Sequence, residues 1–190
     1  MQWANDRRRY GVVAQALHWL TAALVAYLFY LAWVMTDLPL GPEKIRLYNL
    51  HKSLGISILT VAILRLIWRN VSRPPPIPET TPALEVKAAR VAHWALYVLI
   101  FLQVGVGVLH SWSANFPIVV FGVVTLPNPT GPNEALKQAL SPVHAVLGWS
   151  FFVLVLGHAA AALRHHFWLK DAVLLRMLPG TGRAQERREI

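Results

Sequence analysis

Two histidines, His144 and His158, are the residues whose type and spacing point most directly to chemistry. Both lie in an apolar run over residues 142–163, fourteen positions apart. On an α-helix that separation is about 1400°, within about 40° of four full turns, so both imidazoles lie on one face, about 21 Å apart along the axis. Imidazole is a common ligand of transition metals. One helix therefore presents a metal ligand near each side of a membrane.

His18 and His51 complete two pairs of histidines at matching depths. His18 lies about two turns into the first apolar run, on the same side as His158, and His51 begins the second run on the same side as His144. A bare metal ion usually needs three or four protein ligands, whereas two imidazoles saturate a haem iron from both faces. The four histidines predict two haem groups, one above the other, and a path for electrons across a bilayer.

Small residues follow each of these histidines by one helical turn. They are Ala22, Gly55, Gly148 and Ala162, each at position i+4 from its histidine and so on the same helix face. A flat porphyrin beside the ligand needs such a low surface, so Gly55 and Gly148 are interpreted as haem-packing residues. Close helix packing in a membrane is the alternative explanation.

The other histidines fit a ligand role less well. His93 and His110 lie seventeen residues apart, about 100° from a whole number of turns, so they do not share a face. Tyr97 would also crowd a porphyrin beside His93. Contacts with a haem propionate or a quinone, or a place at the membrane interface, are the interpretations for His93. The role of His110 stays open.

Three further basic side chains lie toward the inner side. Arg65 lies within an apolar run, where it either snorkels to the headgroups or pairs with a propionate. His165 and His166 follow the last run among basic residues. Surface positions or propionate contacts are the alternatives for them.

The composition identifies the elements that must position these residues. Of 190 residues, 55% are hydrophobic and 14% charged, with a mean hydropathy of +0.43, which is typical of an integral membrane protein. We expect an all-α, up-down four-helix bundle in a single membrane domain over residues 1–190, with cofactors between helices. The predicted helices cover 11–35, 51–69 (starting a turn earlier), 91–113 and 142–165, followed by a mobile cytoplasmic tail over 180–190. With no cysteines, thiolate sites and disulfides are excluded.

The net charge of +9 is explained by membrane topology and gives no reason to expect nucleic-acid binding. Fourteen of the eighteen Lys and Arg residues lie beside one set of run ends, which the positive-inside rule places in the cytoplasm with both termini. The other four, Lys44, Arg46, Lys52 and Lys137, lie on the outer side. The first run is too long for a signal-peptide core and is interpreted as a retained helix.

The connections between runs differ in kind. Residues 36–48 form a short outer loop, and residues 70–84 form a proline-rich inner linker that we expect to be extended. The long third connection, 114–141, contains the apolar piece Phe116–Leu126, which is too short to span a bilayer. It is expected to lie in the outer interface or to cap the bundle.

Several motifs together resemble the bacterial cytochrome b561 family. They are Gln15-Ala-Leu-His18-Trp19, Asn49-Leu-His51-Lys-Ser-Leu-Gly55, His93-Trp-Ala-Leu-Tyr97, the His144 to His158 pair, Ala161-Ala-Leu-Arg-His165-His166 and Leu175-Arg176-Met177, in an order that covers about residues 8–179. The resemblance implies a multi-pass bacterial inner-membrane protein with two haems b. It also implies His18 and His158 as inner-haem ligands and His51 and His144 as outer-haem ligands.

Within the family, the chain resembles members that oxidise superoxide at the periplasmic face and reduce ubiquinone. This implies a superoxide:quinone oxidoreductase with superoxide, ubiquinone and membrane lipid as partners. Positive charge beside the outer haem would attract the superoxide anion, which makes Lys52 and Arg46 candidates for steering it. Ordinary interfacial positions are the alternative for both residues.

Two other classes of function compete. Related cytochromes b are electron-transfer subunits that link a partner dehydrogenase or hydrogenase to the quinone pool, which would require a protein partner. A transporter relaying protons through its histidines is the third possibility, although none of the four predicted helices is interrupted by proline. The pattern leaves open the electron donor, the side of the quinone site and the oligomeric state.

Overall fold

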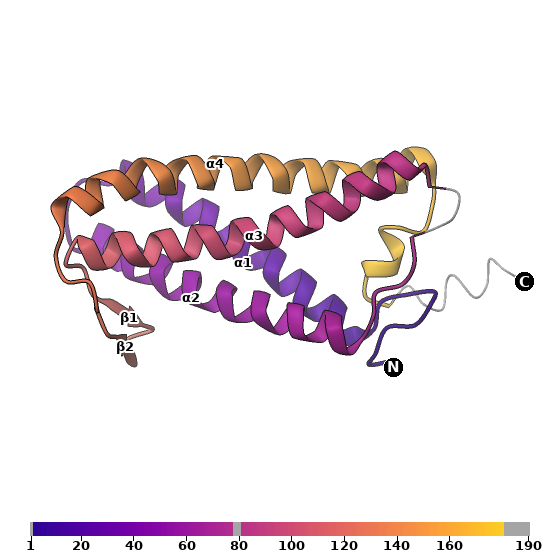
Figure 1. Cartoon of the computed structure of the whole chain (residues 1–190), viewed down its shortest axis with the longest axis horizontal. Coiled ribbons are helices and arrows are strands. Elements are labelled where there is room, and N and C mark those ends of the chain that lie inside the picture. Colours follow the sequence, from indigo (N-terminus) through magenta and orange to yellow (C-terminus); the bar gives the residue numbers. More distant parts are fainter. Residues whose placement is uncertain (1, 78–80, 181–190) are drawn as a thin grey trace, which may run out of the picture.

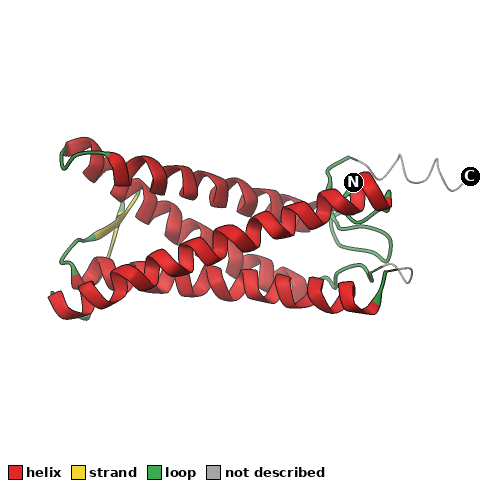
Figure 2. Ribbon diagram, turned by 90° about the horizontal axis from the view of Figure 1, so that it is seen from above, coloured by secondary structure: helices red, strands yellow, loops and turns green. Residues whose placement is uncertain are grey.

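The structure, a computed structural model, describes residues 2–77 and 81–180 and contains four long helices that run back and forth along one axis (Figure 1). They are α1 (Val12–Asp37), α2 (Pro42–Val71), α3 (Ala83–Ser113) and α4 (Glu134–Arg164). A short two-stranded hairpin, β1 (Ile118–Val120) and β2 (Val124–Leu126), joins α3 to α4. Viewed from above, the four helices extend for nearly the whole length of the molecule (Figure 2). The predicted all-α four-helix bundle is confirmed.

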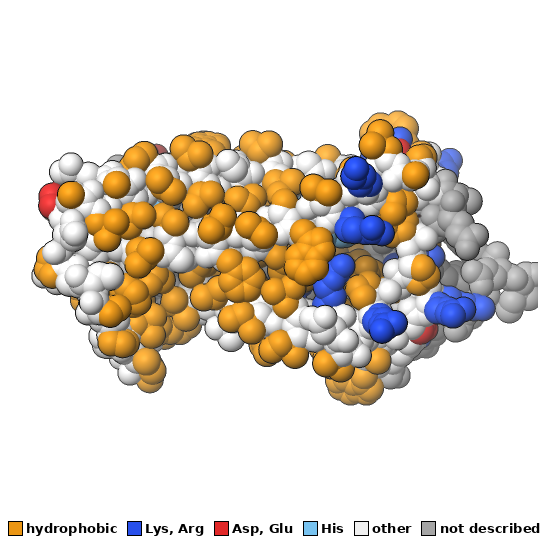
Figure 3. Space-filling view, in the orientation of Figure 1, with side chains coloured by type: hydrophobic (Ala, Val, Ile, Leu, Met, Phe, Trp, Pro, Cys, Tyr) orange, Lys and Arg blue, Asp and Glu red, His pale blue; other side chains and the backbone are white. Residues whose placement is uncertain are grey.

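The two ends of the bundle differ in composition. One end, here called the hairpin end, carries β1 and β2, and the other, here called the basic end, carries the start of α1 and the end of α4 (Figure 1). Lys and Arg side chains gather near the basic end, while hydrophobic side chains cover most of the visible length (Figure 3). This separation of charge along the bundle matches the pattern read from the sequence.

All four helices are long and apolar enough to cross a membrane. Large apolar side chains point outward along their length, among them Tyr30, Trp33, Trp149 and Val153. A soluble protein would bury such side chains, whereas lipid solvates them. The chain is therefore a multi-pass membrane protein.

Three helices begin earlier than hydropathy alone predicts. α2 starts at Pro42, α3 at Ala83 and α4 at Glu134, instead of near residues 45–51, 91 and 142. The added turns are polar, and local signals start them: Pro42 occupies the first turn of α2, and the Asn133 side chain accepts a hydrogen bond from the Leu136 amide at the start of α4. These turns extend the helices past the apolar region that the hydropathy pattern detects.

Pro142 consequently lies inside α4 and does not begin it. Its ring nitrogen cannot donate the helical hydrogen bond to the carbonyl of residue 138. α4 nevertheless continues unbroken through Pro142 from Glu134 to Arg164, so proline interrupts none of the four helices among the described residues.

The apolar piece of the third connection lies beside α2. β1 and β2 pair antiparallel, with Val119 opposite Thr125, and Ile118 is only 1% exposed. Ser53 of α2 holds the hairpin, because its hydroxyl accepts from the Phe121 amide at 3.0 Å. The same hydroxyl lies 2.9 Å from the Asn49 carbonyl of its own helix and 3.3 Å from the Val119 carbonyl. Ile118 thus packs on the bundle, whereas Phe121, Val123 and Val124 are exposed, so both the cap and the outer interface stay predictions for this segment.

At the basic end the chain continues past α4 through a π-helical turn, η1 (His165–Leu169), and a short 3-10 turn, η2 (Leu175–Met177). In the inner linker, residues 73–77 have no regular secondary structure. Most of the predicted mobile tail, residues 181–190, lies outside the described residues.

Candidate functional site

Three histidines from three helices meet toward the basic end. The ring centres of His18 (α1) and His158 (α4) are 6.3 Å apart, and those of His93 (α3) and His158 are 5.3 Å apart. Two imidazoles on opposite sides of one metal, with metal–nitrogen bonds of about 2 Å, have ring centres about 6 Å apart. The His18–His158 pair therefore has the spacing that one shared metal needs, and His93 lies too close to His158 for such a position.

Arg65 of α2 completes this cluster, so all four helices contribute to it. Its Nη2 lies 3.2 Å from Nδ1 of His18, and its guanidinium lies 5.5 Å from the centre of the Tyr97 ring. Among the described residues no carboxylate pairs with Arg65. Burial raises the pKa of the nearby Tyr10 phenol, so that group supplies no negative charge either. A cation held within apolar helices without an anion is costly, and a bound anionic group would remove that cost.

The Arg65 contact also fixes the tautomer of His18. Guanidinium only donates hydrogen bonds, so Nδ1 of His18 accepts and the ring proton lies on Nε2. An anionic group that attracts Arg65 would therefore also release Nδ1 of His18.

A second histidine site lies toward the hairpin end. The Nδ1 atoms of His51 (α2) and His144 (α4) are buried and have no hydrogen-bond partner. Nε2 of His144 lies 3.2 Å from the side-chain nitrogen of Gln103 (α3), whose own oxygen is buried and unpartnered. Buried polar atoms normally have hydrogen-bond partners. These unpartnered atoms therefore indicate a site that a bound molecule would complete.

Glycines shape the space around this second site. A Cβ atom placed on Gly55, one turn after His51, would meet nothing within 4 Å. A Cβ on Gly107 of α3 would lie 3.0 Å from the His144 ring, and one on Gly148 would lie 3.2 Å from the Gln103 amide. Gly55 therefore leaves open space beside its histidine, while Gly107 and Gly148 let α3 and α4 approach each other at His144 and Gln103.

The two candidate steering residues differ in their surroundings. The ammonium of Lys52, next to His51, donates to the Pro117 carbonyl at 2.6 Å and lies 3.9 Å from the centre of the Phe116 ring. Arg46 is exposed and paired with Glu43 at 2.7 Å, one turn earlier on α2. Among the residues that the structure describes, no carboxylate pairs with Lys52 beside His51, whereas the charge of Arg46 is largely offset.

Comparison with known proteins identifies the family of this chain. The family model for prokaryotic cytochrome b561 matches residues 9–180. The chain belongs to the cytochrome b561 family. It is 38% identical over 181 residues to cytochrome b561 homolog 2 of Escherichia coli (strain K12), an alignment that covers 94% of this chain and 95% of that protein.

Two further relatives match over most of their length. The probable superoxide oxidase CybB of Yersinia pestis is 33% identical over 179 residues, covering 90% of this chain and 97% of that protein. Cytochrome b561 homolog 1 of Escherichia coli (strain K12) is 29% identical over 166 residues, covering 86% and 93%. The sequence resemblance to this family is therefore confirmed.

Cytochrome b561 proteins bind haem b and transfer electrons in membranes. The residues present fit that cofactor on three counts: the His18–His158 spacing, the cation of Arg65, which no carboxylate among the described residues pairs with, and the unpartnered Nδ1 atoms of His51 and His144. When bound, haem b supplies a one-electron redox centre, and the chain supplies its ligands, its charge partners and an apolar surrounding.

Several neighbours of these sites could not be found from periodicity. His93 joins the cluster around His158, although His93 and His110 do not share a face of α3. Gly107 and Gln103 contact the second site only because α3 packs against α4. His165 lies between Asp171, at 2.5 Å, and Glu85, at 3.7 Å. The His165 side chain is only 14% exposed and contacts Asp171, so it is not a free surface residue, while its predicted propionate contact stays a prediction.

Proposed function

We propose that this cytochrome b561 carries electrons through two haems b, held by His18 with His158 and by His51 with His144, from superoxide at the periplasmic face to ubiquinone. The observation that carries the proposal is the presence of two separate histidine sites toward opposite ends of one membrane-spanning bundle. The 33% identity to a probable superoxide oxidase supports the choice of superoxide as donor.

The reaction balances with two superoxide anions for each quinone. Each superoxide loses one electron and leaves as dioxygen, and ubiquinone takes up the two electrons and two protons to become ubiquinol. The chain's own contributions are electrostatic and positional. Lys52 attracts the anion toward the hairpin end, the four histidines hold the redox centres, and Arg65 compensates a propionate of the inner group.

Stopped-flow absorbance of the oxidised protein mixed with superoxide, with and without a ubiquinone analogue, tests this function. We expect rapid reduction of the haem bands, followed by reoxidation that depends on the quinone. Bands that ignore superoxide but respond to quinol would contradict the proposal and favour an electron-transfer subunit, whose outer-side protein partner could then be sought by co-purification.

Lys52→Gln is expected to slow haem reduction by superoxide about fivefold at low ionic strength, because it removes the cation beside His51, which no carboxylate among the described residues pairs with. The salt dependence of the rate should flatten as well. Lys52→Arg, which keeps the charge, and Arg46→Gln, whose charge Glu43 already offsets, are the controls and should stay within about twofold. The rates are measured by stopped flow at several salt concentrations, and a Lys52→Gln rate equal to that of the controls would rule out steering by Lys52.

We further propose that the protein lies in the bacterial inner membrane with its basic end and both termini in the cytoplasm. Because the native chain has no cysteine, single cysteines can report this orientation without background. Leu40→Cys and Val123→Cys, at positions 87% and 83% exposed near the hairpin end, should react with an impermeant maleimide on intact spheroplasts. Leu84→Cys, at the basic end, should react only after permeabilisation, and the reverse pattern would overturn the orientation.

A further inference from the structure

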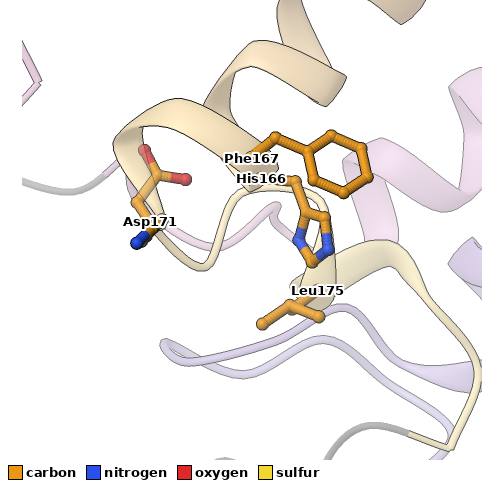
Figure 4. Close-up of a pocket in the computed structure, with 5 residues that line it drawn as sticks. His166, Phe167, Asp171 and Leu175 are labelled. Carbon is orange, nitrogen blue, oxygen red and sulfur yellow. The ribbon is translucent and has the colours of Figure 1, made fainter.

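The segment that follows η1 turns back beneath the bundle and reaches α1. Residues 170–178, here called the C-terminal strap, begin at Lys170, whose φ of 54° lies in the left-handed region and turns the chain away from the axis of α4. The strap ends in the short turn η2 and at Leu178. A shallow pocket lies between η1 and the strap, lined by His166, Phe167 and Leu175 together with Lys170 and Asp171 (Figure 4).

Contacts with η1 and the inner linker fix the start and end of the strap. At its start, one oxygen of Asp171 pairs with Nδ1 of His165 and the other accepts from the Val173 amide. Near its end, the Arg176 guanidinium donates to the Pro76 carbonyl at 2.8 Å. The strap therefore occupies a defined position across the basic end.

The strap contacts α1 at two side chains that flank His18. The side-chain nitrogen of Gln15 donates to the carbonyls of Arg176 and Leu178, at 3.2 Å each. The indole nitrogen of Trp19 donates to the Met177 carbonyl at 2.9 Å. Gln15 is only 8% exposed, and Trp19 packs edge-on against the His18 ring, with ring centres 5.4 Å apart.

These contacts bracket the ligand position on its helix. Gln15 lies three residues before His18, on nearly the same face, and Trp19 lies immediately after it, about 100° around the axis. Two anchors at different angles and heights restrict both the rotation and the sliding of the first turns of α1. Because the acceptors are backbone carbonyls, the contact depends on the path of the strap, which the Asp171 and Arg176 side chains hold in place.

We propose that the C-terminal strap is a positioning element for the inner haem, which holds His18 in its ligating position through Gln15 and Trp19. This inference rests on the proposed function, because it assumes that His18 and His158 hold a haem. It assigns a role to Gln15, Trp19 and the Leu175-Arg176-Met177 motif, which the electron path itself does not use.

The test uses the full-length protein carrying His51→Ala and His144→Ala, so that the inner haem is observed alone. Into it are placed Gln15→Met, which keeps the side-chain length, and Trp19→Phe, which keeps an aromatic ring. Together they remove the three hydrogen bonds. We expect haem transfer to an excess of a haem-scavenging apoprotein to become about tenfold faster, the effect of losing a few ordinary hydrogen bonds. Amide hydrogen exchange should show faster exchange across residues 170–178 in the same variant.

The matched control is Trp149→Phe, at an exposed tryptophan of α4 far along the helix from the strap. A second protein, with wild-type His51 and His144 but with His18→Ala and His158→Ala, reports the effect of the same two substitutions on the outer haem. Faster inner-haem loss with an unchanged outer haem supports the inference. A freed strap with unchanged inner-haem loss, or equal loss from both sites, overturns it.

The result separates the inference from the function on which it rests. If the protein lacking His51 and His144 binds no haem at all, or if the protein lacking His18 and His158 keeps two, the proposed ligand assignment fails. If the inner haem is present and indifferent to Gln15 and Trp19, only the positioning role fails.

Discussion

His158→Ala is expected to halve the haem bound per protein chain. The ring centres of His18 and His158 are 6.3 Å apart, a spacing that suits one metal held from both sides, so removing one imidazole leaves the inner group with a single ligand. The other pair, His144 on the opposite half of α4 and His51 on α2, should keep its haem. The pyridine haemochrome assay measures the ratio, and low-spin signals in electron paramagnetic resonance show which site has been lost.

His93→Ala is the matched control for this prediction. Its ring centre lies 5.3 Å from that of His158, too close for a metal shared between them, so this variant should keep both haems. A His158→Ala protein that still binds two haems would contradict the ligand assignment. A His93→Ala protein that loses one would move the assignment to His93.

The relative positions that could be predicted best from the sequence are those of residues on the same helix. The fourteen-residue spacing of His144 and His158 fixes their common face and axial separation wherever α4 packs. Depth along the apolar runs then selects their partners. The structure brings the rings of His18 and His158 together and leaves the Nδ1 atoms of His51 and His144 buried without partners. The four-helix architecture follows from hydropathy in the same way. A long apolar helix exposes apolar side chains to lipid and makes all its backbone hydrogen bonds within itself.

The features that could not be predicted depend on contacts between elements. The approach of His93 to His158 depends on the rotation of α3 about its axis, which the residue spacing within α3 does not determine. The polar first turns of α2, α3 and α4 are held by local capping and proline signals that a hydropathy window averages away. The strap reaches α1 across more than 150 residues of sequence, through backbone acceptors that carry no side-chain signature.

Gly55→Leu is expected to remove the outer haem while leaving the bundle folded. Gly55 lies one turn after His51, on the same helix face, and a Cβ there would meet nothing within 4 Å. If this open space accommodates part of the porphyrin, a leucine side chain would fill it and exclude the cofactor. The pyridine haemochrome ratio should fall by half, and the remaining haem should show the properties of the inner site.

Gly105→Leu provides the control, because Gly105 is also helical and also has nothing within 4 Å of a Cβ, but it is exposed on α3. Both substitutions improve helix propensity by about 1 kcal/mol. A loss of haem in either variant therefore cannot be explained by a weakened helix. Selective loss in Gly55→Leu would therefore identify the space beside His51 as part of the cofactor site. Equal haem content in the two variants would show that the cofactor does not occupy this space. The outer haem would then lie against another face of His51 and His144.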